Sequence, residues 1–135
     1  MAIQLSTAVR NARLDAIETT VGVSAVMRIY SGAQPANCAA ANSGTLLAEL
    51  SLPVDWMAGA SAGSKALAGT WTDSSANGTG TAGHWRIYEL TIATCHLQGS
   101  VTATGGGGDM EVDSVSFTTG QVFNVTSFTL TDANA

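Results

Sequence analysis

Charge is scarce in this sequence of 135 residues, because Asp, Glu, Lys and Arg together make up 11% of it. In an ordinary soluble domain these four residue types make up about a quarter of the sequence. The net charge is −5 and no cluster of basic residues is present, so the chain has little with which to neutralise phosphates, and we expect no nucleic-acid partner. Low charge combined with 45% hydrophobic residues favours association, and the sequence therefore predicts a subunit of an assembly.

Long hydrophobic segments are also missing. No apolar run approaches the roughly 20 residues that a membrane-spanning helix needs, and residues 1–5 lack the basic start and apolar centre of a signal peptide. We therefore expect no membrane partner and synthesis in the cytoplasm. The length suits a single domain, which we divide into an N-terminal helical segment, 1–22, and a β-rich body, 23–135.

Motifs for catalysis or cofactor binding are weak. Residues 59–63 match G-x-S-x-G and residues 78–83 match G-x-G-x-x-G, but neither match lies between a strand and a helix, as the two chemistries require. The run of four glycines at 105–108 is not followed by Lys and Ser or Thr, so it is not a phosphate-binding loop. The sequence predicts no catalytic residue and no cofactor.

Metal ligands are not grouped in a favourable way. Asp109, Glu111 and Asp113 alternate, so on a strand they would share one face at a spacing too wide for a single ion. A solvated strand face is the better interpretation, and the sequence predicts no metal.

The two cysteines, Cys38 and Cys95, could form a zinc site only with His84 and His96, and no C-x₂-C pair supports it. Both cysteines follow an Arg-Ile-Tyr segment at a similar distance. A Cys38–Cys95 disulfide, formed after release into an oxidising medium, is therefore a hypothesis.

One helix is predicted, from a cap at Ser6 or Thr7 to about Thr20, with Gly22 ending it. Its apolar residues form two stripes on nearly opposite sides. One stripe contains Val9, Ala12 and Ala16, and the other contains Leu14, Ile17 and Val21. One stripe would face the body of the protein; the other would face a neighbouring subunit or remain in solvent.

The rest of the chain alternates short segments rich in β-branched and aromatic residues with small-residue turns, which is typical of an antiparallel β-sandwich. The fold class that we predict is mainly β, a jelly-roll-like sandwich with one N-terminal helix. The predicted strands are 23–30, 45–50, 67–73, 81–90, 95–103, 109–118 and 121–131.

The tripeptide Arg-Ile-Tyr occurs twice, at 28–30 and 86–88. Period-2 alternation puts Arg28, Tyr30, Arg86 and Tyr88 on outer strand faces, where they would be either assembly contacts or a cover in which Arg stacks on a neighbouring Tyr. The apolar residues beside them belong to a predicted core that also includes the C-terminal aromatic residues: Met27, Ile29, Trp85, Ile87, Phe117, Phe123, Phe128 and Leu130. The candidate assembly interface combines helix and strand residues: Arg10, Arg13, Leu14, Ile17, Arg28, Tyr30, Arg86 and Tyr88.

The last two predicted strands, 109–118 and 121–131, have matching apolar patterns. A hairpin register that pairs Phe117 with Phe123 also pairs Val112 with Phe128, but the apolar face changes side in both strands between these levels. The pattern predicts a hairpin with a sharp bend, which can pass from one sheet to another.

Four segments resemble a family of small virion structural proteins of tailed bacteriophages. They are Met27-Arg28-Ile29-Tyr30-Ser31-Gly32-Ala33-Gln34-Pro35, Gly44-Thr45-Leu46-Leu47-Ala48, Gly80-Thr81-Ala82-Gly83-His84-Trp85-Arg86-Ile87-Tyr88 and Thr126-Ser127-Phe128-Thr129-Leu130-Thr131. Members of this family are capsid-decoration or tail-associated proteins. The resemblance implies a protein of the virion that binds other copies of itself and other virion proteins, above all the major capsid protein. It carries over no catalytic or ligand residues.

The function that this implies is non-enzymatic: a decoration or cement protein, which stabilises a capsid by contact area repeated through symmetry. Two alternatives remain. One is a subunit of the tail, collar or fibres, and the other is a host-facing carbohydrate-binding module that would use Trp56 or Trp71, although the alternation around Trp71 favours burial in the core.

Overall fold

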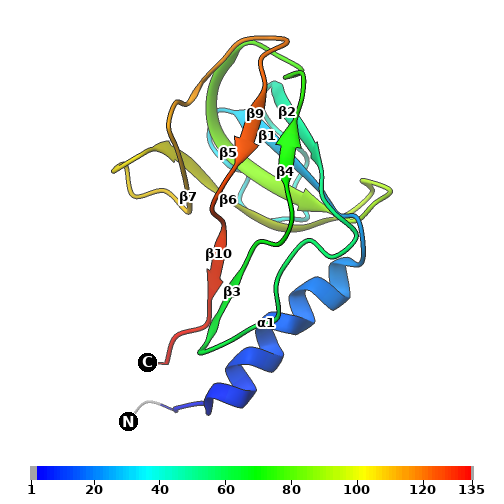
Figure 1. Ribbon diagram of the computed structural model, residues 1–135. Helices are drawn as coiled ribbons and strands as arrows, with labels where there is room; N and C mark the ends of the chain where they lie inside the picture. The colour runs from blue at the N-terminus through cyan, green and yellow to red at the C-terminus, as the bar shows by residue number, and fades with distance from the viewer. Residues whose placement is uncertain (1–2, 135) are drawn as a thin grey trace.

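The structure, a computed structural model, describes residues 3–134, and Figure 1 shows the arrangement of its elements. The chain is mainly β with one helix, as predicted. The elements in chain order are α1 (Thr7–Val21), β1 (Val26–Ser31), β2 (Leu46–Ser51), β3 (Ser64–Ala66), β4 (Trp71–Asp73), β5 (Gly80–Tyr88), β6 (Cys95–Ala103), β7 (Met110–Val112), β8 (Ser116–Phe117), β9 (Phe123–Val125) and β10 (Thr129–Thr131).

The largest sheet has the strand order β2-β1-β5-β6-β7, and β8 pairs with the beginning of β5. Two further sheets have two strands each, β4 with β9 and β10 with β3. All pairs are antiparallel except β6 and β7, which are parallel, and this exception departs from the all-antiparallel prediction. The parallel pair forms because the short glycine-rich turn after β6 carries the chain back beside the last three residues of that strand, Val101–Ala103.

One hydrophobic core joins the sheets. Seven of the eight predicted core residues are buried, and Leu130 packs against the cluster while partly exposed. Aromatic rings link the layers: Phe117 lies 4.9 Å from Phe123, and the ring of Phe128 meets that of Trp85 edge-on at 5.2 Å between centroids. Gly99 permits this packing, because a Cβ there would come within 2.7 Å of the Trp85 indole.

Helix α1 begins and ends where the sequence predicts. Ser6 is the N-cap and its hydroxyl accepts from the Val9 N–H, while Gly22, with φ of 93°, ends the helix. Leu14 and Val21 are buried against the body, whereas the stripe of Val9, Ala12 and Ala16 is exposed. The predicted arrangement of two apolar stripes on opposite sides of the helix is therefore confirmed, and the second stripe is exposed to solvent.

Polar side chains also dock α1. Asn11, Asp15 and Glu18 accept from the backbone N–H groups of Gly63, Ala60 and Met57 respectively, at 2.9–3.0 Å. The spacing of the three acceptors puts them on one helix face, which runs antiparallel to the loop before β3. This face explains why hydrophobic periodicity in the helix is weak, because three of the side chains that dock the helix are polar and form hydrogen bonds.

The predicted C-terminal hairpin is wrong. The segment 109–118 pairs with β6 and β5 through β7 and β8, and the segment 121–131 pairs with β4 and β3 through β9 and β10. The change of apolar face has the predicted structural meaning, because the chain leaves one sheet at Val125 and joins another at Thr129. Pattern alone could not tell which strands serve as partners.

Candidate functional site

The outer face of the largest sheet carries the two Arg-Ile-Tyr segments. Arg28 pairs with Arg86 across β1 and β5, and Val26 pairs with Tyr88. In both segments, the residues that alternate with Arg and Tyr point into the core, as the alternation predicts, since Met27, Ile29 and Ile87 are fully buried. Loop 32–44 covers this polar face, so most of it is not surface.

Arg86 is the centre of the cover. Its guanidinium donates to Gln98 Oε1, to Asn42 Oδ1 at 2.7 Å, and to the carbonyl oxygens of Asn37 and Ala40 at 3.0 Å. It is 2% exposed. Every one of these acceptors is neutral, and three of them lie in loop 32–44. Arg86 therefore holds the loop on the sheet by charge-assisted hydrogen bonds.

The two tyrosines are buried next to this centre. Tyr88 donates to Asn42 Oδ1 at 2.6 Å and lies 3.4 Å from the Tyr30 hydroxyl, and Tyr30 stacks on His84 at 5.3 Å. Burial, followed by the contact with Tyr30, raises the pKa of Tyr88 to about 12.

Three of the predicted assembly contacts are thus corrected: Tyr30, Arg86 and Tyr88 are buried under loop 32–44 and have no surface with which to contact a partner. Arg28 remains partly exposed. It pairs with Glu49 and lies over the Tyr88 ring at 5.8 Å from its centroid. The alternative interpretation, in which Arg stacks on the Tyr of a neighbouring strand, is the one that the structure shows here.

The two cysteines are free and partly buried. Cys95 pairs with Tyr88 in the sheet, and its thiol donates to the Leu97 carbonyl at 3.2 Å. Burial, followed by the nearby thiol of Cys38, raises the pKa of Cys95 to about 12. The fold therefore brings together the two residues of the disulfide hypothesis, as thiols.

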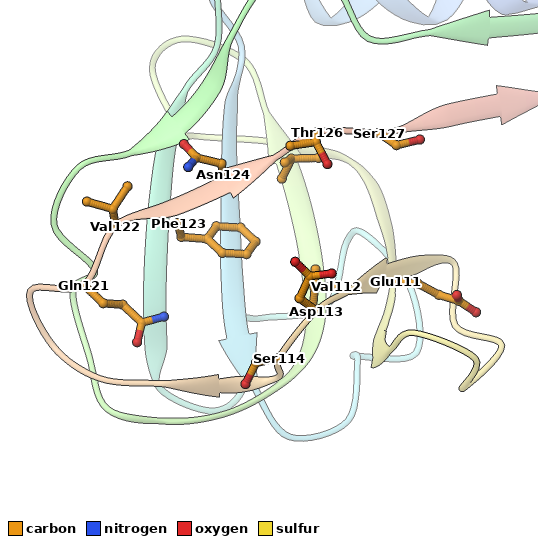
Figure 2. A pocket seen from close by; sticks show the side chains of 11 residues that line it. Glu111, Val112, Asp113, Ser114, Gln121, Val122, Phe123, Asn124, Thr126 and Ser127 are labelled. Carbon is orange, nitrogen blue, oxygen red and sulfur yellow. The ribbon is translucent and has the colours of Figure 1, made fainter.

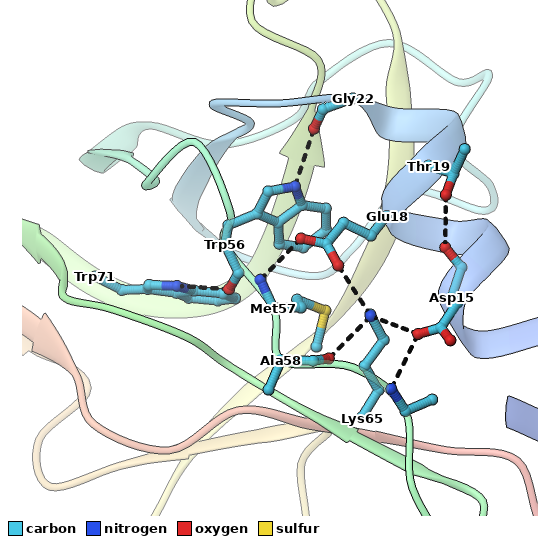
Figure 3. Close-up of polar contacts among 10 residues, drawn as sticks. Asp15, Glu18, Thr19, Gly22, Trp56, Met57, Ala58, Lys65 and Trp71 are labelled. Carbon is cyan, nitrogen blue, oxygen red and sulfur yellow. Dashed lines mark hydrogen bonds and ion pairs between the residues drawn. The ribbon is translucent and has the colours of Figure 1, made fainter.

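A second buried cation, Lys65, was not anticipated from the sequence. It is 2% exposed, and its ammonium contacts Asp15 Oδ1 at 2.8 Å, Glu18 Oε2 at 2.9 Å and the Ala58 carbonyl at 2.9 Å (Figure 3). Burial alone would lower the pKa of Lys65, but the bonds with Asp15 and Glu18 raise it overall. The bond from Lys65 in turn lowers the pKa of Asp15.

Lys65, Asp15 and Glu18, which we call the Lys65 cluster, fasten one side of α1 to β3. The opposite side of the helix is exposed. Of the helical residues predicted at the interface, Leu14 is buried and Arg10 is partly buried, donating to the Asp132 carbonyl at 3.1 Å. Arg13 is exposed over 60% of its side chain while pairing with Asp132, and Ile17 is partly exposed. Leu14 is thus corrected to a core residue, and Arg13 and Ile17 are accessible.

Beside the uncovered helix side lies a groove of about 360 Å³ between α1 and β6, which we call the α1–β6 groove. Ala16, Ile17 and Val21 from the helix and Leu97 from β6 supply apolar walls, and Arg13 and His96 supply charge or hydrogen bonds at its edge. His96 lies 3.4 Å from Glu89. A partner bound in this groove would exclude water from the apolar walls, and the polar side chains at the edge would orient it.

The acidic residues after the glycine turn mostly have protein partners. Glu111 accepts from the N–H groups of Gly105 and Gly107 at 3.0 Å, and Asp109 accepts from Ser100. Hydrogen bonds from these groups lower the pKa of both carboxyls. In the described part of the chain, no three His, Cys, Asp or Glu side chains are grouped as metal ligands.

The remaining motifs are structural. Ser61, in the G-x-S-x-G match, lies in the turn before β3, with Ala62 and Gly63 at positive φ, and the G-x-G-x-x-G match enters β5. Trp56 and Trp71 are 0% and 1% exposed, so neither offers a platform for stacking a sugar. Their indole N–H groups donate to Gly22 and Trp56 carbonyls respectively (Figure 3).

Comparisons of the chain with protein-family models, curated proteins and solved structures found no match. Residues 3–134 include no helix that combines the length and hydropathy needed to traverse a bilayer.

Proposed function

We propose that the protein is a non-enzymatic structural subunit of a tailed-bacteriophage virion, most specifically a decoration or cement protein that binds the major capsid protein and other copies of itself. The observation that carries this proposal is the uncovered side of α1, where Val9, Ala12 and Ala16 are exposed next to the α1–β6 groove. An apolar helix stripe that has no partner within residues 3–134 is suited to a partner from another chain.

The low charge and the resemblance to virion proteins support the same proposal. We further propose that the packing of the largest sheet against the β4–β9 sheet forms a jelly-roll-like sandwich, supported by the aromatic contacts that join the two layers. A subunit of the collar, tail or fibres remains the second candidate. It would use the same surface at a lower copy number, whereas the buried Trp56 and Trp71 speak against the carbohydrate-binding alternative.

The first test is the copy number per particle, measured by quantitative mass spectrometry against the major capsid protein. A copy number comparable with that of the capsid protein supports decoration, and a small number of copies supports the collar, tail or fibres. Absence from purified particles would overturn the proposal.

The second test concerns the surface. Val9→Glu places a charge on the uncovered stripe of α1, and Val54→Glu makes the same change at a valine that is also exposed, at 66% against 45% for Val9. Glutamate in the first helical turn is compatible with the helix dipole, so the fold should be retained. We expect Val9→Glu to reduce incorporation into particles by at least about tenfold, which corresponds to 1.4 kcal/mol, and Val54→Glu to leave incorporation unchanged.

A further inference from the structure

Several strands in the described part of the chain pair on one side only, and three of them, β7, β9 and β10, lie along one groove. Within residues 3–134, β7 pairs only with β6, β9 only with β4, and β10 only with β3. A strand offers hydrogen-bonding groups on two sides. Each of these strands therefore has one side without a strand partner.

The groove consists of three connected sections. The first, of about 340 Å³, lies between 111–114 and 121–127; the second, of about 330 Å³, lies between 108–111 and 127–129. The third, of about 260 Å³, runs along 128–131 past Trp85. The first two share Glu111 and Ser127, and the last two share Asp109, Phe128 and Thr129. The first two sections thus lie between β7 and the segment from β9 to Thr129, and the third lies between β10 and residues of β5 and β6.

Figure 2 shows the first section: β9 lies on one side, the segment from Glu111 to Ser114 lies on the other, and the Phe123 ring points between them. These are the two segments whose matching apolar patterns predict a hairpin. In the structure they face one another without pairing, because each is paired on its other side. The groove therefore lies where the hydrogen bonds of the predicted hairpin would have formed.

The floor of the groove is apolar, and its rim combines acidic side chains with uncharged polar ones. Val112, Phe123 and Val125 line its first section and are buried members of the core. Asp113 lies on the rim and is exposed, and Figure 2 shows its carboxylate directed toward β9. Among the described residues, no Lys, Arg or His lines any of the three sections. The potential in the groove is therefore negative.

We propose that this groove binds an extended segment of a partner protein, which adds as a strand beside β7 and β9 and carries basic side chains toward Asp113. Backbone hydrogen bonds to the open edges would supply much of the affinity, and alternate apolar side chains would rest on Val112, Phe123 and Val125. This inference rests on the strand pairing and does not depend on the proposed virion function.

Charge selects a partner protein over a second copy of the chain. The protein has a net charge of −5, and two of its five basic residues, Lys65 and Arg86, are buried in hydrogen-bonded clusters. A second copy would therefore bring few cations and a like net charge to an acidic groove.

The experiment titrates the ¹⁵N-labelled protein with an acetylated and amidated peptide of about nine residues that alternates valine or threonine with lysine. We expect amide shift changes confined to 109–114 and 121–131. An analogue N-methylated at alternate residues keeps the composition and charge but removes backbone donors, and we expect it to bind at least about tenfold more weakly.

A pair of variants tests the charge. Asp113→Lys should weaken peptide binding about threefold or more, while Asp55→Lys, at an exposed carboxylate that lines none of the three sections, should not change it. Shift changes elsewhere, equal binding of the N-methylated analogue, or no binding overturns the proposal. So does a dimer in sedimentation whose protected amides map to 109–131, because a second copy would then be the occupant.

Discussion

Lys65 and Arg86 are both 2% exposed, yet the protein satisfies the two charges in different ways. The Lys65 ammonium contacts two carboxylates and one carbonyl, whereas the Arg86 guanidinium contacts only neutral oxygens. The guanidinium has five donors in a fixed plane and is weakly hydrated, so preoriented neutral dipoles suffice for it; the compact ammonium needs counter-charges. The docking of α1 therefore depends on ionised carboxyl groups, and the docking of loop 32–44 depends on the loop conformation that presents three oxygens.

Removing the Arg86 guanidinium should have the largest effect. Arg86→Met keeps the apolar part of the side chain, removes the bonds that hold loop 32–44 on the sheet and leaves the Ala40 carbonyl and Gln98 Oε1 without their donor, so we expect the free energy of unfolding to fall by about 4 kcal/mol. Urea denaturation measures this change. Arg13→Met is the control, because the Arg13 side chain is 60% exposed and its pair with Asp132 should contribute at most about 1 kcal/mol. Equal losses in the two variants would contradict the role of Arg86.

Sequence patterns predicted what depends on local periodicity. The limits of α1, the inward side of both Arg-Ile-Tyr segments and most of the core are confirmed, because capping and alternation determine them locally. The burial of Tyr30 and Tyr88 was not predictable in this way, since it depends on a loop that is distant in sequence. The partners of the last strands were not predictable either. Asn11, Asp15 and Glu18 share one helix face, and that polar spacing was the one available sign of the Lys65 cluster.

Oxidation would add a covalent bond to the loop that Arg86 holds. With oxidised glutathione, the Cys38 thiolate displaces one glutathione to give a mixed disulfide, and Cys95 then displaces the second, so two protein thiols become one disulfide and two reduced glutathiones form. We expect the free energy of unfolding to rise by about 3 kcal/mol. Thiol titration and urea denaturation check this, with Cys38→Ser as the control; two thiols remaining after equilibration would exclude the disulfide.

Replacing Lys65 should have a smaller effect than replacing Arg86. Lys65→Met leaves two carboxylates behind, but the side chain of Asp15 is 50% exposed and can regain water, so we expect a loss of about 2 kcal/mol. Hydrogen exchange should become faster at the amides of Met57 and Ala60, which Glu18 and Asp15 hold. Unchanged exchange at these amides would show that Leu14 and Val21 alone keep α1 in place.

Acid should separate the two cations with the smallest and most local effect. The bond from Lys65 lowers the pKa of Asp15 below its ordinary value of 3.8, so the stabilisation is present above that value and is lost as the pH falls through the lower, folded-state pKa. We expect the amide of Ala60 to lose protection as the pH falls below 3.8, after correction for intrinsic exchange. The amide of Ala40, in the loop that Arg86 holds, has Asn37 as its acceptor and should show no such change. Asp15→Asn retains an acceptor oxygen that does not titrate, and in that variant the pH dependence at Ala60 should disappear; if it persists, another carboxyl group controls the docking of α1.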